Sequence, residues 1–347
     1  MKYLSFAALL LSIISSALSA QSHDQTAIFQ QLYELEDLNL KQRLLQEQWD
    51  PCSRTFNPGK KVRWNHLRSL LVSKLGRPRH GGHDVVATQF MDVKIRANFS
   101  YGLFSKDIED EPVEVFIANQ RCQWYVKTAG KTDSDGRFEA NLGRLPTGKY
   151  PIKVVLKPNS TVATLLITVL ERGTKTAVFD IDGTLTTSDG ELIHEIISRV
   201  FKGDYVPKMR DGAVDAVNLM ESKGYELVYL TGRPYPLHRV TKSWLLSKSF
   251  PRGSLILTNS NSQSVPNKKG VGTFKAKRIK EIKASRINVD HAFGNALTDI
   301  YAYDQAQVSK HKTHIVGKHA GKENTSAIAG YAQYLKKLES LPSVNQH

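Results

Sequence analysis

The segment Thr176-Ala-Val-Phe-Asp-Ile-Asp-Gly-Thr184 decides the fold of the C-terminal half of this 347-residue chain. Residues 176–179 form a short apolar run of strand length, and a polar cluster follows directly. Further along, strand-like and helix-like segments alternate up to residue 316, which is typical of an α/β domain with a largely parallel sheet. Ligands of such sheets bind at the carboxyl ends of the strands, so the cluster after Phe179 is a candidate site.

Two carboxylates lie in this cluster. Asp180 and Asp182 fall on the same side of an extended segment, and Gly183 permits a sharp turn after them. Close carboxylates repel each other unless a cation or a shared proton lies between them. Mg²⁺ is typically bound by one or two carboxylates together with substrate phosphate. The pair therefore predicts a magnesium-dependent site where one carboxylate attacks phosphorus, forming an aspartyl-phosphate, and the other transfers protons.

Groups suited to phosphate follow the next strand and begin a basic helix. Thr231 offers a hydroxyl, Gly232 an unobstructed backbone N–H, and Arg233 a guanidinium that fits phosphate or a lipid headgroup. Lys275 stands at the start of the helix predicted over 274–283 and supplies a compact positive charge. Each feature alone is a weak signal, but their order at element ends predicts one phosphate-binding site.

Two further oxygen donors follow the strand predicted over 291–293. Asn295 and Asp299 are placed for metal ligation. The whole set resembles the haloacid-dehalogenase-like (HAD-like) phosphatase superfamily over residues 175–318, which implies a Rossmann-like domain. That superfamily usually has an acidic residue where Asn295 stands, so this site has one negative charge less. The resemblance implies Asp180 as nucleophile, Asp182 as general acid/base, Thr231 and Lys275 as phosphoryl ligands, and Asp180, Asp182 (through its carbonyl), Asn295 and Asp299 around Mg²⁺.

A narrower resemblance concerns lipid-metabolising families. Residues 180–184, 292–295 and 299–303 resemble the lipin-type catalytic domain, whose members dephosphorylate phosphatidic acid. The C-terminal (LNS2) region of the retinal-degeneration-B/Nir phosphatidylinositol transfer proteins is similar over residues 85–338. Those proteins bind phosphatidic acid there and lack the first-motif aspartates, which this chain retains. The resemblance implies a phosphatase for phosphatidic acid or a related phospholipid, or a non-catalytic module that binds phosphatidic acid or phosphoinositide. The residues that carry the second similarity are 145–153, 169–173, 210–215 and 229–234.

Composition and local patterns divide the rest of the chain. Residues 1–20 read as a cleaved signal peptide, because their apolar run is shorter than the roughly 20 residues of a membrane span. An apolar stripe from Ile28 to Trp49 predicts a helix, and residues 77–83 read as a linker. The predicted domains are a helical extension over 21–85, a β-sandwich over 86–172, the HAD-like domain over 173–338 and a tail over 339–347.

Secretion fits the cysteines and three sequons. Cys52 and Cys122 could form a disulfide or remain free thiols. Glycosylation sequons begin at Asn98, Asn159 and Asn324, a pattern that also occurs by chance. No later segment is long and apolar enough to span a membrane. The oligomeric state is not predicted.

The formal charge of +15 predicts an acidic partner. Basic residues crowd around Lys275 between 268 and 286, and they suit either contact with an anionic membrane surface or simple solvation. No insertion between the motifs is large enough for a cap domain, so bulky phospholipids and soluble phosphomonoesters both remain possible substrates. Nucleic acid is the least favoured partner, because no recognition-helix or base-stacking pattern accompanies the charge.

Overall fold

The computed structural model describes residues 49–50, 52–74, 76–102, 106–187, 207–258 and 267–344. The chain divides into two compact units, 1–49 and 50–347, and all elements below belong to the second. The predicted signal peptide and the predicted helix up to residue 48 lie outside the described residues. Within those described ranges, no helix has the length and apolar character that a membrane span requires.

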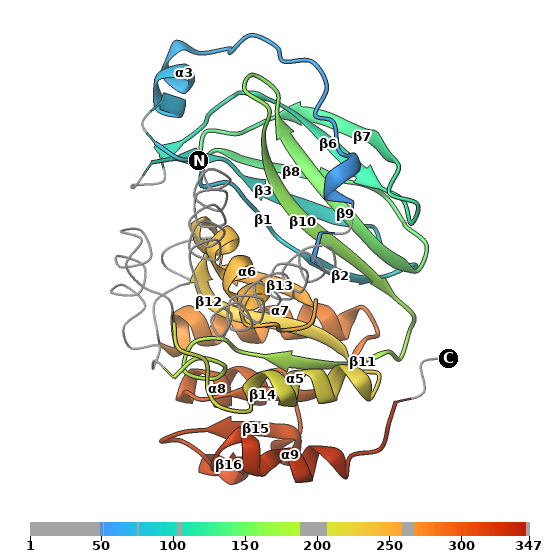
Figure 1. Ribbon diagram of the computed structural model, residues 1–347, viewed down its shortest axis with the longest axis vertical. Coiled ribbons are helices and arrows are strands. Elements are labelled where there is room, and N and C mark those ends of the chain that lie inside the picture. The colour runs from blue at the N-terminus through green and yellow to red at the C-terminus, as the bar shows by residue number, and fades with distance from the viewer. Residues whose placement is uncertain are drawn as a thin grey trace, which may run out of the picture. The chain divides into compact units, whose positions relative to one another are not determined.

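A β-sandwich forms the N-terminal part of the second unit, in the region where the sequence predicts one (Figure 1). One sheet has five strands in the order β2-β10-β9-β6-β7, and the other has three in the order β1-β3-β8. Val115, Ile152 and Ile167 are among the residues that fill the core between the sheets. The strands are β1 (Gly81–Gly82), β2 (Val85–Thr88), β3 (Lys94–Asn98), β6 (Pro112–Ala118), β7 (Trp124–Lys131), β8 (Arg137–Asn141), β9 (Gly148–Leu156) and β10 (Thr161–Leu170), with a separate pair β4 (Ser100–Tyr101) and β5 (Lys106–Asp107).

The predicted linker over 77–83 is wrong, because this segment begins the sandwich. Strand β1 pairs with β3, and a side chain at Gly82 would collide with the backbone of β10. His80 and His83 are buried, and His83 bonds the Asn98 side chain over 2.8 Å. Burial lowers the pKa of both histidines to about 3, so they are neutral structural residues. The two glycines here allow a close approach of neighbouring backbone, at Gly81 by the Tyr235 carbonyl and at Gly82 by the Thr164 carbonyl of β10.

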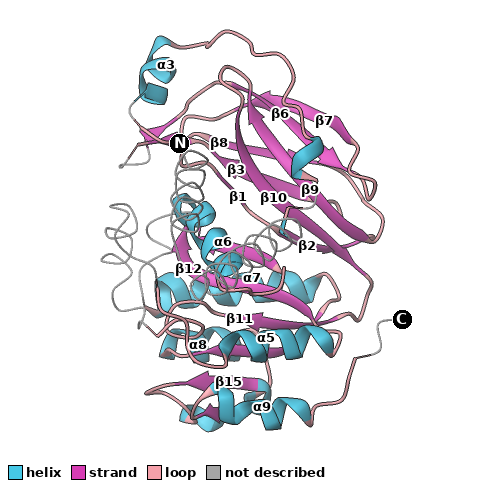
Figure 2. Ribbon diagram, in the orientation of Figure 1, coloured by secondary structure: helices cyan, strands magenta, loops and turns pink. Residues whose placement is uncertain are grey.

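Six parallel strands form the sheet of the C-terminal part, confirming the expected α/β class (Figure 2). Their order is β13-β12-β11-β14-β15-β16, with β11 in the interior. The strands are β11 (Lys175–Phe179), β12 (Glu226–Pro234), β13 (Ser254–Thr258), β14 (Asn288–Gly294), β15 (Thr313–Val316) and β16 (Ser326–Ile328). The helices are α5 (Ala213–Ser222), α6 (His238–Ser247), α7 (Thr273–Ala284), α8 (Leu297–Gln305) and α9 (Tyr331–Glu339).

Helices cover both faces of this sheet. Val178 and its counterparts on neighbouring strands share a core with residues of α7 and α8. Side chains alternate along a strand, so Phe179 and Phe293 point to the opposite face, where their rings stack at 4.3 Å. On that face His314 bonds Tyr334 of α9 over 2.7 Å, and α9 packs against α5. This packing fixes β11 and β14, whose carboxyl ends carry the candidate site.

A disulfide joins Cys52 to Cys122, the option that the sequence left open. The bond ties residues before the sandwich to the turn between β6 and β7, where Trp124 donates to the Cys52 carbonyl over 2.9 Å.

Reduction of this disulfide is expected to lower the free energy of unfolding by about 2–4 kcal/mol, because 70 residues separate the cysteines and the crosslink restricts the unfolded chain. Urea denaturation with and without a reductant measures the effect. The double variant Cys52→Ser/Cys122→Ser should be equally destabilised and should not respond to reductant. An unchanged midpoint after reduction would contradict the expectation.

Candidate active site

The candidate site begins where β11 ends. The Asp180 backbone N–H donates to the Phe293 carbonyl over 3.0 Å, which holds the ends of β11 and β14 together. The chain then turns at Gly183, whose φ of +74° favours glycine. Asp180 and Asp182 are both buried, at 4% and 5% exposure, so neither is an ordinary surface acid.

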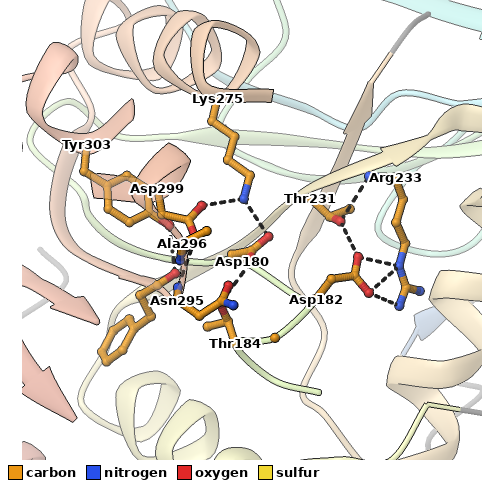
Figure 3. Close-up of polar contacts among 12 residues, drawn as sticks. Asp180, Asp182, Thr184, Thr231, Arg233, Lys275, Asn295, Ala296, Asp299 and Tyr303 are labelled. Carbon is orange, nitrogen blue, oxygen red and sulfur yellow. Dashed lines mark hydrogen bonds and ion pairs between the residues drawn. The ribbon is translucent and has the colours of Figure 1, made fainter. Parts of the chain in front are cut away.

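Lys275 connects two of the predicted acids (Figure 3). Its Nζ lies 2.6 Å from Asp180 Oδ1 and 2.6 Å from Asp299 Oδ1. The other Asp299 oxygen accepts the backbone N–H groups of Asn295 and Ala296, each over 3.0 Å, at the start of α8. Burial alone would lower the pKa of Lys275, but the two carboxylates raise it above its ordinary value, so the side chain is an ammonium.

Thr184 and Asn295 complete this side of the site. The Thr184 hydroxyl lies 2.9 Å from Asp180 Oδ2 and 3.1 Å from Asn295 Oδ1. A hydroxyl has one hydrogen, so it can donate to only one of these oxygens at a time, and the other keeps a lone pair directed into the same space.

This convergence of oxygens is compatible with Mg²⁺. Among the residues that the structure describes, no group of three His, Cys, Asp or Glu side chains is clustered closely enough to bind a metal. Mg²⁺ needs fewer protein ligands than that, since it keeps several waters and uses substrate phosphate. Asp180 supplies a charged oxygen and Asn295 a neutral one, both of the type that Mg²⁺ prefers, and Asp299 lies beside them.

Asp182 is held differently from Asp180. Arg233 forms a bidentate ion pair with it, in which Nε donates to Oδ2 over 2.8 Å and Nη2 donates to Oδ1 over 2.6 Å. Thr231 adds a weaker bond to Oδ2 over 3.3 Å, and Arg233 Nη1 donates to Thr241 over 3.1 Å. Arg233 is 2% exposed, so this guanidinium orients Asp182 instead of facing open space as the predicted substrate contact would. Gly232 is buried in β12 between Thr231 and Arg233.

Charge in the site is not balanced by protein groups alone. Three buried carboxylates, of Asp180, Asp182 and Asp299, face two cations, of Lys275 and Arg233. Burial raises the pKa of Asp180 to about 7 despite the Lys275 ammonium, and the neighbouring acids add to the rise. One further cation would relieve this excess negative charge.

Two supporting residues were absent from the predicted site. Arg210 donates Nε to the Gly183 carbonyl over 2.8 Å and so holds the turn from outside. Thr241 fixes the Arg233 guanidinium from α6. Neither carries a sequence signal for this role, because each contact joins two different segments and depends on how the chain folds between them.

Replacing Gly183 with alanine is expected to disrupt the site. A Cβ there would lie 2.1 Å from Asn295 Nδ2, and a side chain at φ +74° adds about 1 kcal/mol of strain. We expect Gly183→Ala to lower the free energy of unfolding by roughly 1–3 kcal/mol. Gly143→Ala is the matched control, since it has φ +73° and no atom within 4 Å of its Cβ. Equal losses in the two variants would show that strain alone acts, without the clash.

The fold is an α/β domain with a six-stranded parallel sheet that follows a β-sandwich. The chain is similar to two domains of the PITM 1-3 family: the model of the PITM 1-3 LNS2 domain matches residues 177–317, and that of the PITM 1-3 beta-sandwich domain matches residues 78–169.

Relatives of known name agree with this family. Membrane-associated phosphatidylinositol transfer protein 3 of Homo sapiens is 28% identical over 90% of this chain and 31% of its own length. Protein retinal degeneration B of Drosophila melanogaster is 27% identical over 84% of this chain and 23% of its own length. The chain thus spans less than a third of these relatives. Among solved structures, phosphoserine phosphatase from T. onnurineus is 15% identical, with a TM-score of 0.30 over 49% of this chain and 96% of that one.

Proposed function

We propose that this chain is a magnesium-dependent phosphohydrolase that forms an aspartyl-phosphate on Asp180, acting on phosphatidic acid or a related phospholipid. The observation that carries the proposal is the buried lysine bridge, in which Lys275 of α7 lies 2.6 Å from Asp180, directly after β11, and 2.6 Å from Asp299 in the first turn of α8. Such a bridge orients a carboxylate for attack and leaves a positive charge beside it for a phosphoryl oxygen.

The residues divide the chemistry between them. Asp180 would attack phosphorus. Lys275, besides orienting Asp180, would stabilise the negative charge on the phosphoryl oxygens. Asp182 would give a proton to the leaving oxygen as the bond between that oxygen and phosphorus breaks. It would later take a proton from the water that attacks phosphorus and frees Asp180, and both transfers require one Asp182 oxygen to part from Arg233. Asp180, Asn295, Asp299 and the Asp182 carbonyl would hold Mg²⁺, which when bound neutralises charge on the phosphoryl group.

The rim of the site supports a phospholipid as substrate. Leu297, which begins α8 two residues after Asn295, is 44% exposed. Lys268 and Lys269, on the turn that leads into α7, are exposed as well. Helix α8 packs against this turn. Exposed apolar and basic side chains on neighbouring elements suit a molecule with acyl chains and an anionic headgroup. The human relative named above is a membrane-associated phosphatidylinositol transfer protein, which is consistent with a lipid ligand.

A second candidate function is a non-catalytic module that binds phosphatidic acid or phosphoinositide. The observation in its favour is the grip of Arg233 on both oxygens of Asp182, since a carboxylate held in this way has no free oxygen for proton transfer.

Measuring the phosphate that purified full-length protein releases from different substrates distinguishes between the candidate functions. The substrates are vesicles that contain phosphatidic acid and, separately, a soluble phosphomonoester, each with Mg²⁺ or with EDTA. Release from the vesicles that stops in EDTA supports the proposal, and release from the soluble ester alone supports a phosphatase for soluble phosphomonoesters. Vesicle binding with no release from any substrate supports the binding module.

We also propose that the protein is secreted, and the structure distinguishes between the three sequons. Asn98 is 1% exposed and its side chain bonds His83. Asn159 donates to the Tyr101 hydroxyl, whereas Asn324 is exposed in a short turn after β15. We expect a glycan on Asn324 and none on Asn98 when the protein is made through a secretory pathway. Mass spectrometry of glycosidase-treated protein identifies the modified asparagine, and the control Asn324→Gln should carry no glycan at residue 324. A glycan on Asn98 would contradict the expectation.

A further inference from the structure

Helix α3 (Leu67–Lys74) presents an apolar face to the outside. Figure 1 shows α3 at the margin of the sandwich, outside its sheets. Leu67 and Leu71 are 71% and 55% exposed, while Ser69 is buried. Residues four apart lie on the same helix face, so the two leucines form one exposed apolar strip. Lys74 lies on the same face, one turn after Leu71. This is the reverse of the usual arrangement, in which a surface helix buries its leucines.

The helix is nevertheless firmly attached. Glu111, which is fully buried, accepts the backbone N–H groups of Asn65 and His66 over 2.9 and 3.0 Å just before α3 begins. Arg68 pairs with Glu109 over 3.0 Å on the flank of the helix. The exposed leucines are therefore held outward by fixed contacts on the other side of α3.

The surrounding segment has charge of one sign only. Residues 51–83 contain no Asp or Glu. Val62, which is 46% exposed, lies among the basic residues that precede α3. Five of the basic residues are exposed and form no ion pair with any residue that the structure describes: Lys60, Lys61, Arg63, Lys74 and Arg77. Acidic side chains of the sandwich do contact this segment, since Glu109 pairs with Arg68 and Asp110 with His66, but they leave the five residues above without an ion pair to any described residue. An apolar strip together with these basic side chains fits a surface that is anionic and has an apolar layer beneath.

We infer that α3 and the basic residues around it dock the protein on an anionic membrane. The leucines would enter the boundary between headgroups and acyl chains, and the lysines and arginines would contact lipid phosphates. The inference deepens the proposed function, because docking would hold the candidate active site near a phospholipid substrate. The docking itself needs neither Asp180 nor turnover.

Vesicle flotation of the full chain tests the inference. The probes are vesicles of phosphatidylcholine with phosphatidylserine and vesicles of phosphatidylcholine alone, so that phosphatidic acid is absent. We expect binding to the anionic vesicles only, weakening as salt rises. Lys60→Gln/Lys61→Gln should weaken it by about 25-fold, at roughly fivefold per basic residue. The matched control Lys127→Gln/Lys336→Gln removes two exposed lysines elsewhere and should leave binding unchanged.

The leucines are tested in the same way. Leu67→Ser/Leu71→Ser should weaken binding by roughly tenfold or more, since two apolar side chains no longer leave water. Tyr125→Ser/Val126→Ser is the control, because these β7 residues are 47% and 52% exposed. Asp180→Asn should bind normally, which separates failure of docking from failure of the proposed catalysis. Unchanged binding in the leucine variant would overturn the inference. In that case, a changed sedimentation coefficient of the leucine variant would indicate that a second copy of the chain covers the leucines. A lowered melting temperature would indicate that other residues of the same chain cover them.

Discussion

Asp180→Asn is expected to lower the rate of phosphate release by at least about 10⁴-fold, because an amide cannot attack phosphorus as a carboxylate does. The substitution keeps the shape of the side chain and its contact with Thr184, so the fold should be preserved. Initial rates on phosphatidic acid vesicles with Mg²⁺ measure the effect. Substrate binding should survive, which would place the loss in the chemical step.

The matched control for this variant is Asp215→Asn, which changes an exposed carboxylate on α5. It should retain the full rate. A rate for Asp180→Asn within tenfold of the unsubstituted protein would show that another group is the nucleophile.

Lys275→Met is expected to produce the largest loss of stability, about 3–5 kcal/mol of the free energy of unfolding. The substitution leaves Asp180 and Asp299 as buried carboxylates without their common partner, and breaking a buried ion pair from one side costs this much. Urea denaturation measures it. Lys277→Met, two residues further along α7 and exposed, is the control and should change stability by less than about 0.5 kcal/mol.

A double variant checks the cause of that loss. Combining Lys275→Met with Asp299→Asn removes one of the uncompensated charges, so the two effects should not add. A loss below about 1 kcal/mol for Lys275→Met alone would contradict the bridge as a source of stability.

The strand and helix order of the α/β part follows from local pattern. The predicted alternation up to residue 316 ends with β15, whose last residue is Val316, and α7 extends the predicted helix over 274–283 by one residue at each end. Apolar runs of strand length between amphipathic segments are a strong signal for an α/β fold. The apolar residues of a helix and of a strand recur at different intervals, so the two kinds of element can be distinguished in the sequence. The last elements were not predicted. Helix α9 begins after Gly330 without a side-chain cap, and β16 has only three residues, so neither carries a local boundary signal.

The sequence also predicted which segments would meet at the site. Carboxyl ends of parallel strands share one edge, so Asp180 and Asp299 were expected together, and Lys275 lies between them. The partner of Arg233 could not be predicted, because a guanidinium suits phosphate and carboxylate equally and only the tertiary fold brings it to Asp182. The structural role of His80 and His83 depends in the same way on contacts with distant strands.

The central claim is that Asp180 carries the phosphoryl group during turnover. Its most direct test is an acid quench of the full-length protein with Mg²⁺ and phosphatidic acid labelled on its phosphate, followed by mapping of labelled peptides. The account predicts acid-stable label on the peptide that contains Asp180, and none in Asp180→Asn. Phosphate release without label on that peptide, or label that persists in Asp180→Asn, would contradict it.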